Sequence, residues 1–447
     1  MAGRLIELGI VAGDRIVVLG RNRPSFLDAT LACLRSGVVP VPIDIHLPPA
    51  AVRERIDDAD PALILAHPEL EPLARAARRR VEVMDDDWPA TARTETLSPW
   101  PLTRAMHYTS GTTGRSKGVH AGLLGADGGR ALAAEEHAIW DFRPDDVHLV
   151  CGPLYHSGPH RFAVNTLLFG GSVVLVDGFD GSVAAQAIAR HGVTTSFMVP
   201  THLARLLRTD PDPAALRQVR WIAHAGAPCP AALKHRALDT FPAGTVHEFY
   251  GATEGQFTVI GPEEWRARPG SVGRARAGRV LTIVEDGRAV PPGAVGTVYT
   301  SAPEFARFEY WRDPARTAAA WDGDRFTVGD LGSIDADGYL FLAGRQGDLI
   351  ISGGVNVYPA EVERVLLEHP AVFEAAVFGI PDDEWGERVC AAVVPGAGDE
   401  VDAEQLRMWA RARLSGAQMP KDLVVTHELP RTGSGKVRRA ALHQLLA

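Results

Sequence analysis

The apolar and polar positions in the first half of the chain alternate between short strand-like runs and amphipathic helical patterns. "RIVVLG" (Arg15 to Gly20) is a short β-branched run typical of a buried strand. "SFLDATLACLRSG" follows with apolar residues at helical spacing, Ser25 as the expected N-cap and Gly37 as the stop. The alternation returns in "VVPVPI", "ALILA", "GSVVLV", "TTSFMV" and "RWIAHAG". This rhythm predicts parallel α/β units.

The pattern changes twice in the second half. After about Ser271, "VLTIVEDGRAVPPGAVGTVYT" predicts β-hairpins. Near Arg345 to Asp348 a new unit begins, with the helix "PAEVERVLLEHP", strands "EAAVFGI", "VCAAVVP" and "LVVTHELP", and helices "AEQLRMWARARL" and "RRAALHQLL". We expect an α/β protein. Its large N-terminal domain, residues 1–345, has α/β layers plus a β-rich subdomain, and its small C-terminal domain, residues 346–447, is α+β.

Composition narrows the class of protein. A chain of 447 residues with 46% hydrophobic and 23% charged residues is typical of a globular protein of two or more domains. A net charge of −9 argues against a general nucleic-acid binder. Four scattered cysteines without a CxxC pair favour buried thiols in a reducing cytoplasm over disulfides or zinc. The longest apolar stretch, residues 162–176, is too short to span a membrane.

The chain contains only four lysines, and the other 46 − 4 = 42 basic residues are arginines. A lysine in such a chain can mark a place that needs a compact point charge rather than a planar guanidinium, although a chance surface lysine is the plain alternative. Two of the lysines lie in glycine-rich stretches, Lys117 in "YTSGTTGRSKGV" and Lys436 in "LPRTGSGKVRR". The other two are Lys234 and Lys421.

The stretch "YTSGTTGRSKGV" has the composition of a phosphate-binding loop. Hydroxyls and glycines alternate, so side chains and backbone N–H groups can both face phosphate oxygens, and Lys117 adds charge. A flexible linker is disfavoured because buried-looking strands flank the stretch. Ser116 stands where the Walker motif requires glycine, which argues against a kinase that makes ADP.

These motifs resemble the adenylate-forming superfamily: acyl- and aryl-CoA synthetases, luciferases and the adenylation domains of peptide synthetases. "YTSGTTGRSKGV" is similar to the phosphate loop of that family. The remaining family motifs follow in the family's order: "PLYHSGP", "HAGAP", "EFYGATEG", "TVGDLGSIDADGYLFLAGRQGDLIISGGVNVYPAEVE" and "PRTGSGKVRR". Six motifs in order over nearly the whole chain make the resemblance specific. The sequence is most similar to that of bacterial fatty-acid or bile-acid type CoA ligases.

The resemblance implies an ATP-dependent carboxylate-CoA ligase with ATP, Mg²⁺ and CoA as cofactors. The acid, fatty or aromatic and monocarboxylic, is activated as acyl-AMP with release of pyrophosphate and is then transferred to CoA. The small domain is mobile and swings between the two half-reactions. The resemblance further implies a cytoplasmic monomer or homodimer whose partners are small molecules, with no nucleic acid and no membrane span.

The resemblance assigns the ATP site to the phosphate loop, two nucleotide segments and a ribose segment. In it, Glu248 accepts from the adenine amine, Tyr250 stacks on the ring and Asp330 accepts from the ribose hydroxyls. The ATP-binding residues are Thr109, Ser110, Gly111, Thr112, Thr113, Gly114, Lys117, Ala225, Gly226, Ala227, Glu248, Phe249, Tyr250, Gly251, Thr253, Asp330 and Arg345.

Four residues carry the implied chemistry. Lys436 bridges the substrate carboxylate and the α-phosphate, where a guanidinium would be too broad. Thr253 contacts the α-phosphate, and Glu254 ligates Mg²⁺, a hard cation that prefers carboxylate oxygen. His156 lies beside the substrate carboxylate. The implied acyl pocket comprises His156, Phe162, Ala252 and Phe257.

The C-terminal domain carries the implied CoA contacts, Ser352, Gly353 and Gly354, and a hinge at Gly347 and Asp348. Glycine at the hinge departs from the charged or polar residue usual in the family, and it would loosen the hinge. No carrier domain with a phosphopantetheine serine follows, which favours free CoA as the acceptor.

Other interpretations stay open beside these assignments. Asp330 is also compatible with a turn cap, Glu254 with a helix first turn and Tyr250 with an ordinary half-buried aromatic. His156 and His160, four residues apart, would suit a metal on a helix, but "SGP" between them argues against a helix there. The alternative functions are transfer of acyl-AMP to a carrier protein, an amine or nitrite, and a catalytically inactive binding protein.

Overall fold

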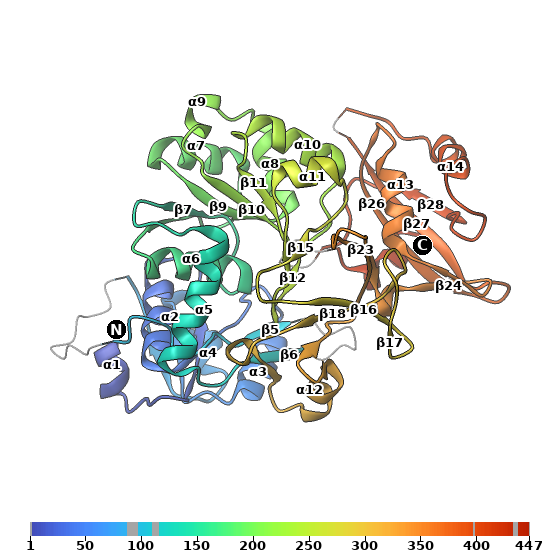
Figure 1. Ribbon diagram of the computed structural model, residues 1–447. Coiled ribbons are helices and arrows are strands. Elements are labelled where there is room, and N and C mark those ends of the chain that lie inside the picture. Colours follow the sequence, from blue (N-terminus) through green and yellow to red (C-terminus); the bar gives the residue numbers. More distant parts are fainter. Residues whose placement is uncertain (1, 87–96, 110–115, 397, 432–436, 447) are drawn as a thin grey trace.

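The computed structural model describes residues 2–86, 97–109, 116–396, 398–431 and 437–446. Two parallel sheets form the first half of the chain (Figure 1). One has the order β2-β1-β3-β4, with β1 Arg15–Leu19, β2 Val39–Pro42, β3 Leu63–Ala66 and β4 Val81–Val83. The other has the order β11-β10-β9-β7-β8, with β7 Val147–Val150, β8 Ser172–Leu175, β9 Thr195–Met198, β10 Trp221–His224 and β11 Val246–Glu248.

Helices cover both faces of these sheets, because strands such as β1 are apolar on both sides. Ile16 and Val18 share a core cluster with residues of α2 (Pro24–Ser36) and α6 (Ser157–Leu168), which fill the space between the sheets. Val17 and Leu19 pack against α3 (Pro49–Ala59) on the opposite face. On the outer face of the second sheet lie α7 (Gly181–His191), α8 (Pro200–Arg208) and α10 (Ala231–Thr240). The predicted α/β layers are confirmed.

The ends of α2 follow the predicted pattern in part. The helix stops at Gly37, whose φ of 80° is left-handed and favours glycine. Ser25 is not the N-cap, because Arg23 holds that position and Pro24 begins the helix. The Ser25 hydroxyl lies 3.0 Å from Nε2 of the buried His67 instead.

The expectation that "SGP" excludes a helix after His156 is wrong. Helix α6 begins at Ser157, directly after His156, and places Gly158 and Pro159 in its first turn. Proline is tolerated there because the first-turn N–H groups have no intrahelical partner. His160 is therefore helical, and its backbone N–H donates to the His156 carbonyl at 3.1 Å.

The β-rich subdomain follows as an antiparallel sheet of seven strands. Its hairpin of β16 (Leu281–Glu285) and β17 (Arg288–Ala289) turns at Asp286 and Gly287, which both have positive φ. The other strands are β18 (Gly296–Ser301), β20 (Trp321–Asp322), β21 (Arg325–Phe326), β22 (Asp330–Ile334) and β23 (Leu340–Arg345). A separate three-stranded sheet joins β5 (His107–Thr109), β6 (Lys117–His120) and β19 (Glu309–Tyr310).

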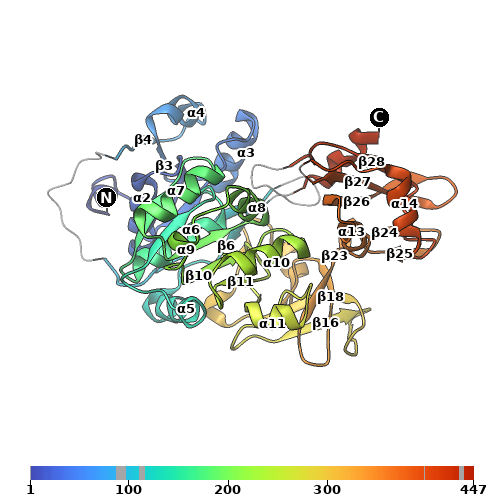
Figure 2. The same cartoon turned by 90° about the horizontal axis from the view of Figure 1, so that it is seen from above.

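A smaller α+β unit follows β23, at the right of Figure 1 and of Figure 2. Its sheet has the order β25-β24-β27-β26, with β28 paired to β27. The strands are β24 Ile350–Ser352, β25 Val355–Val357, β26 Val372–Asp382, β27 Gly386–Pro395 and β28 Asp422–Val425, and the α-helices are α13 Pro359–Leu367 and α14 Ala403–Arg411. The predicted last helix is instead the 3₁₀ segment η4, Arg439–Leu446.

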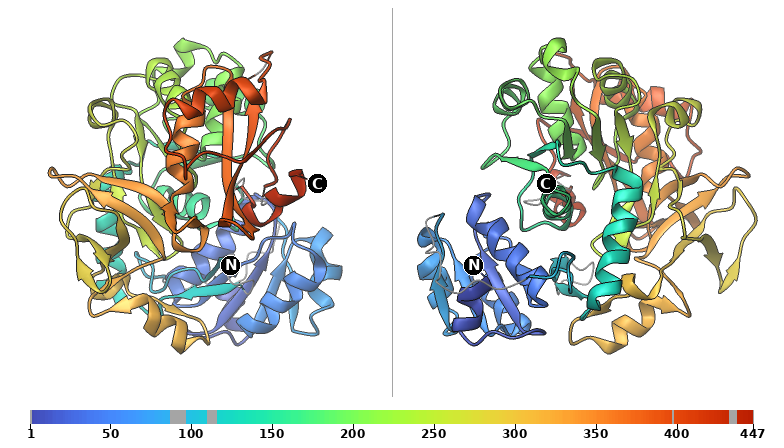
Figure 3. Two further views of the ribbon diagram at one scale, coloured as in Figure 1. Left: turned by 90° about the vertical axis from the view of Figure 1, so that its right-hand side faces the viewer. Right: turned by 60° about the vertical axis from the view of Figure 1, so that its left-hand side comes forward.

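All four cysteines are free thiols. Among the described residues, no helix combines the length and the apolar character that crossing a bilayer requires. In the left view of Figure 3 the C-terminal unit lies in front of the second parallel sheet. Helix α13 of this unit contacts β23 of the β-rich subdomain.

Candidate active site

The phosphate-loop motif lies on a β-hairpin whose two arms are described. Thr109 ends β5 and pairs with Lys117, which begins β6. The Thr109 hydroxyl is buried, and no hydrogen bond to it is found among the described residues. Ser110, Gly111, Thr112, Thr113 and Gly114 lie outside the described residues, and their contacts with phosphate remain predictions.

Lys117 meets Glu254 and Tyr310 at one point. Its Nζ lies 3.2 Å from Glu254 Oε1 and donates to the Tyr310 hydroxyl at 2.7 Å. Tyr310 in turn donates to Glu254 Oε1 at 2.8 Å. Burial, followed by the charge of Glu254, raises the pKa of Tyr310, so the phenol keeps its proton. Lys117 and Glu254, two predicted site residues that are 254 − 117 = 137 positions apart, are thus linked through Tyr310.

Tyr310 is a site residue that sequence reasoning missed. It belongs to "RFEYWRDPARTAAAW", which carries no local sign of chemistry. Its position becomes clear only in the fold, because β19 pairs with β6 and sets Tyr310 opposite Val119. The Lys117 ammonium lies 3.9 Å from the Tyr310 ring centroid, a further favourable contact.

Thr253 and Glu254 form the turn of a short hairpin between β12 (Gly251–Ala252) and β13 (Gly255–Gln256). A Cβ on Gly251 would lie 2.6 Å from the Gly255 carbonyl oxygen, so the tight pairing requires glycine. The Thr253 hydroxyl lies 3.5 Å from that of Ser157, at the start of α6. The hairpin therefore brings the "EFYGATEG" motif to the segment that follows His156.

The predicted ribose residues form a second linked set. Arg345 Nε donates to Asp330 Oδ1 at 2.8 Å across the β22–β23 pair. The Tyr250 hydroxyl donates to Asp330 Oδ2 at 2.6 Å. Burial and the Asp330 charge raise the pKa of Tyr250 well above its ordinary value. The hydrogen bond fixes Tyr250 next to Asp330. This arrangement is compatible with the predicted stacking of Tyr250 on adenine and the predicted contact of Asp330 with the ribose.

The adenine segments follow the ends of two adjacent parallel strands. Ala225, Gly226 and Ala227 come directly after β10, and Glu248 ends β11, opposite His224. Gly226 has a φ of 90°, a conformation that favours glycine. The carboxyl edge of a parallel sheet is where open α/β folds place ligands.

The predicted acyl residues are only partly brought together. Phe162 is 0% exposed and stacks on Phe197 at 5.1 Å, in an aromatic cluster that also holds Phe249. Phe257 belongs to a different cluster, where it packs on Tyr250. Ala252 is half-buried on β12, and a pocket role for these residues remains a prediction.

Arg161, next to Phe162 on α6, is paired with residues inside the protein. Its Nη2 donates to Gln256 Oε1 at 2.8 Å, and its Nε lies 3.6 Å from Glu136 Oε2. The guanidinium carbon is 5.3 Å from the Phe162 ring centroid. Its charge is therefore balanced inside the protein, which fits the expected monocarboxylic acid.

The predicted hinge residues and two of the three predicted CoA residues lie in turns at the start of the C-terminal unit. Gly347 and Asp348 form the 3₁₀ turn η3 (Gln346–Asp348), and a Cβ on Gly347 would meet no atom within 4 Å. Gly353 and Gly354 have φ of 58° and 77° and close the β24–β25 hairpin, so the turn itself explains both glycines. Ser352 is buried on β24.

Lys436 lies outside the described residues, but residues on both sides of it make contacts within the C-terminal unit. Arg431 forms a bridge with Val437 and an ion pair of 2.6 Å with Glu374 of β26. Arg439 pairs with Asp348 of the predicted hinge at 3.2 Å. The terminal loop is thus anchored to the same unit that contains the hinge.

The donor set around Glu254 suits Mg²⁺. Glu254 is a buried carboxylate facing the hairpin of the phosphate loop, and no group of three or more potential metal ligands occurs among the described residues. Mg²⁺ commonly takes one or two carboxylates and completes its shell with phosphate oxygens and water. A single carboxylate next to a phosphate-binding hairpin is sufficient for that mode.

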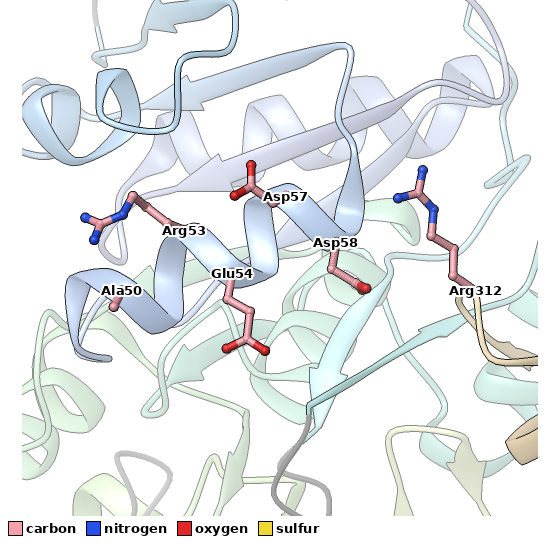
Figure 4. Close-up of a pocket in the computed structure, with 6 residues that line it drawn as sticks. All are labelled: Ala50, Arg53, Glu54, Asp57, Asp58 and Arg312. Atoms are coloured by element: carbon pink, nitrogen blue, oxygen red, sulfur yellow. The ribbon is translucent and has the colours of Figure 1, made fainter.

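A surface hollow of about 640 Å³ lies along α3 (Figure 4). It touches the site only indirectly: Tyr108, the neighbour of Thr109, donates to Asp58 at its edge at 2.7 Å. Charges of both signs line it, and we assign no ligand to it. The lining residues are Ala50, Arg53, Glu54, Asp57, Asp58 and Arg312.

Comparison with known proteins agrees with this geometry. A family model described as AMP-binding enzyme matches residues 1–311, and one described as AMP-binding enzyme C-terminal domain matches residues 361–436. The chain is 33% identical to a feruloyl-CoA synthase of an Amycolatopsis species, over 99% of this chain and 91% of that protein. It is 31% identical to an indoleacetate–CoA ligase of Aromatoleum aromaticum, over 100% and 91%.

Solved structures give the same result. An o-succinylbenzoate CoA synthetase from Bacillus subtilis, in complex with its acyl-adenylate intermediate, superposes with a TM-score of 0.87 at 29% identity, covering 99% of this chain and 90% of that one. The amide bond synthetase McbA from Marinactinospora thermotolerans superposes with a TM-score of 0.87 at 28% identity, covering 100% and 92%. The matched families and the full-length likeness establish that this chain belongs to the AMP-binding enzyme family, the adenylate-forming enzymes.

Proposed function

We propose that this protein is an AMP-forming acid–CoA ligase that activates an aromatic monocarboxylic acid. The observation that carries the proposal is the junction of Lys117, Tyr310 and Glu254, which joins a phosphate-binding hairpin to a buried carboxylate. The aromatic class is favoured over a fatty acid because ferulate and indoleacetate are the acids in the names of two full-length relatives.

The reaction runs in two steps. A carboxylate oxygen of the acid attacks the α-phosphorus of ATP, and pyrophosphate leaves with the electrons of the broken P–O bond. The CoA thiolate then attacks the acyl carbon, and AMP leaves. In the first step Lys117 and the predicted Lys436 meet negative charge on the phosphates, and Thr253 contacts the α-phosphate. Mg²⁺ held by Glu254 would neutralise further negative charge on the phosphates.

The remaining residues position the substrates. Asp330, held by Tyr250 and Arg345, accepts from the ribose hydroxyls. Glu248 accepts from the adenine amine, and His156 lies beside the acid. Ser352, Gly353 and Gly354 contact CoA after the C-terminal unit turns about Gly347 and Asp348. The cytoplasmic location and the monomeric or homodimeric state remain predictions.

A second acceptor has support from one likeness. McbA is an amide bond synthetase, and it matches this chain over its full length as well as the CoA ligase does. The alternative is that an amine, a carrier protein or nitrite receives the acyl group in place of CoA.

The test supplies Mg-ATP and a panel of aromatic and fatty acids, with CoA, with a primary amine or with neither acceptor, and measures AMP, acyl-CoA and amide. The proposal predicts that AMP and acyl-CoA appear together, fastest with an aromatic acid. AMP that requires an amine rather than CoA would favour the alternative acceptor. Acyl-CoA from fatty acids alone would contradict the aromatic class.

A further inference from the structure

Lys234 is completely buried, although no role for it follows from the reaction above. It lies on α10 with 0% exposure, and its Nζ donates to His224 Nε2 at the end of β10. The same Nζ lies 3.4 Å from Glu248 Oε2 at the end of β11, and His224 Nε2 is 3.6 Å from that oxygen. Two other titratable groups face this trio, Cys229 before α10 and His247 on β11.

The hydrogen-bond chemistry fixes the state of the trio. An ammonium only donates, so His224 accepts through Nε2 and carries its proton on Nδ1. Burial, then the charge of Lys234, lowers the pKa of His224 well below its ordinary value, and the ring is neutral. Burial also raises the pKa of Glu248 and lowers that of Lys234, while their mutual attraction opposes both shifts. Lys234 is the cation that balances the Glu248 carboxylate.

One member of the trio reaches the surface of the site. The side chain of Glu248 is 9% exposed, whereas those of Lys234 and His224 are 0% exposed. Glu248 ends β11 at the carboxyl edge of the sheet, two residues before Tyr250, which is bonded to Asp330. A buried ion pair adds little net stability compared with apolar packing, so stability alone does not account for this one.

We propose that Lys234 is a positioning residue that keeps Glu248 ionised and turned toward the purine, and thereby makes the site select a 6-amino over a 6-oxo purine. This inference rests on the proposed function. An ionised carboxylate has only acceptors, so it accepts from the amine of adenine and repels the carbonyl of hypoxanthine. A protonated carboxyl would donate to that carbonyl and lose the preference.

The test compares the dissociation constants of ATP and ITP, measured by calorimetry without acid or CoA. We expect Lys234→Met to reduce the ITP-to-ATP ratio of dissociation constants by about tenfold or more, the size of a hydrogen bond to a charged group. The preference of this variant increases as the pH rises, because burial without the cation raises the pKa of Glu248 further. Lys421→Met, which removes a lysine of the C-terminal unit, is the matched control and leaves the ratio unchanged.

A second variant keeps the inference testable if Lys234→Met does not fold. Glu248→Gln preserves the volume, and its amide can turn an N–H toward the carbonyl of hypoxanthine, so we expect the same loss of preference at every pH. An unchanged ratio in Glu248→Gln, or equal weakening of ATP and ITP in Lys234→Met, overturns the inference. If the wild-type protein binds neither nucleotide, the proposed function itself fails.

Discussion

Lys117 and Glu254 lie 3.2 Å apart, and the hydroxyl of Tyr310 bonds to both. A cation proposed to meet phosphate and a carboxylate proposed to meet Mg²⁺ thus neutralise each other in the protein without ligands. Mg-ATP supplies the opposite partner to each of them. In the proposed mechanism, binding would exchange this internal ion pair for two pairs with Mg-ATP, next to the Tyr310 hydroxyl.

Tyr310→Phe removes this bridge while keeping the ring. We expect adenylation to slow about tenfold, because one hydrogen bond to a charged group is lost, with little change in unfolding free energy. The measurement is the rate of pyrophosphate release under single-turnover conditions. Tyr299→Phe, on β18, is the matched control. Equal rates for Tyr310→Phe and wild type would remove Tyr310 from the site.

Asp330→Asn tests the proposed acceptance of hydrogen bonds from the ribose hydroxyls. We expect the KM for ATP to rise about tenfold and the KM for 2′-deoxy-ATP to rise less, since the deoxy nucleotide already lacks one donor. Steady-state kinetics with both nucleotides measures the difference. Asp337→Asn, an exposed aspartate in the β22–β23 turn, should leave both constants unchanged. A parallel rise for both nucleotides would argue that Asp330 acts only as a structural partner of Arg345.

Gly347→Pro restricts the proposed hinge. We expect thioester formation to slow more than adenylation, because in the proposed mechanism the C-terminal unit turns between the two half-reactions. Rapid-quench measurements of acyl-AMP and acyl-CoA separate the two. Gly347→Ala should be mild, since a Cβ there would meet no atom within 4 Å. Equal slowing of both half-reactions by proline would count against a hinge at this position.

His148 makes stability depend on pH. Burial lowers its pKa to about 3, below the value of about 6.5 in an unfolded chain, so the folded state resists protonation. The contribution is complete above about pH 6.5 and is lost as the pH falls toward the folded value. Between pH 7 and pH 5 we expect His148 to account for about 2 kcal/mol of lost stability.

Urea unfolding at the two pH values tests this expectation. His148→Asn should be less stable at neutral pH, because it loses the stacking on Phe162, but its loss on acidification should be smaller than that of wild type. His191→Asn, which changes an exposed histidine, provides the control. If His148→Asn lost as much stability on acidification as wild type, the pH dependence of stability would come from other residues.

Local patterns predicted the elements that local forces determine. The apolar run of β1 and the helical spacing of α2 correspond to buried elements, and Gly37 ends the helix where expected. The start of α6 was mispredicted because Gly158 and Pro159 disfavour a helix interior but not a first turn. The last helix is a 3₁₀ segment, a difference that side-chain periodicity does not reveal.

The residues of the site likewise fall into those that the sequence predicts and those that only the fold shows. Motif residues such as Asp330 and Arg345 are brought together by a single β-pair and were named from sequence. Tyr310 was not, because its contact with Lys117 crosses 193 positions. The role of Phe162 in the acyl pocket stays a prediction. The fold packs its side chain into an aromatic cluster, and sequence alone does not show which way a helical side chain faces.

The most direct test of acyl-adenylate formation follows the oxygen atoms of the acid. The protein is given Mg-ATP, CoA and an aromatic acid whose carboxylate carries heavy oxygen, and the products are examined by mass spectrometry. With both carboxylate oxygens labelled, attack of the carboxylate on the α-phosphorus predicts one heavy oxygen in AMP, one in the thioester carbonyl of acyl-CoA, and unlabelled pyrophosphate. Heavy oxygen in inorganic phosphate, with ADP as the nucleotide product, would contradict the account.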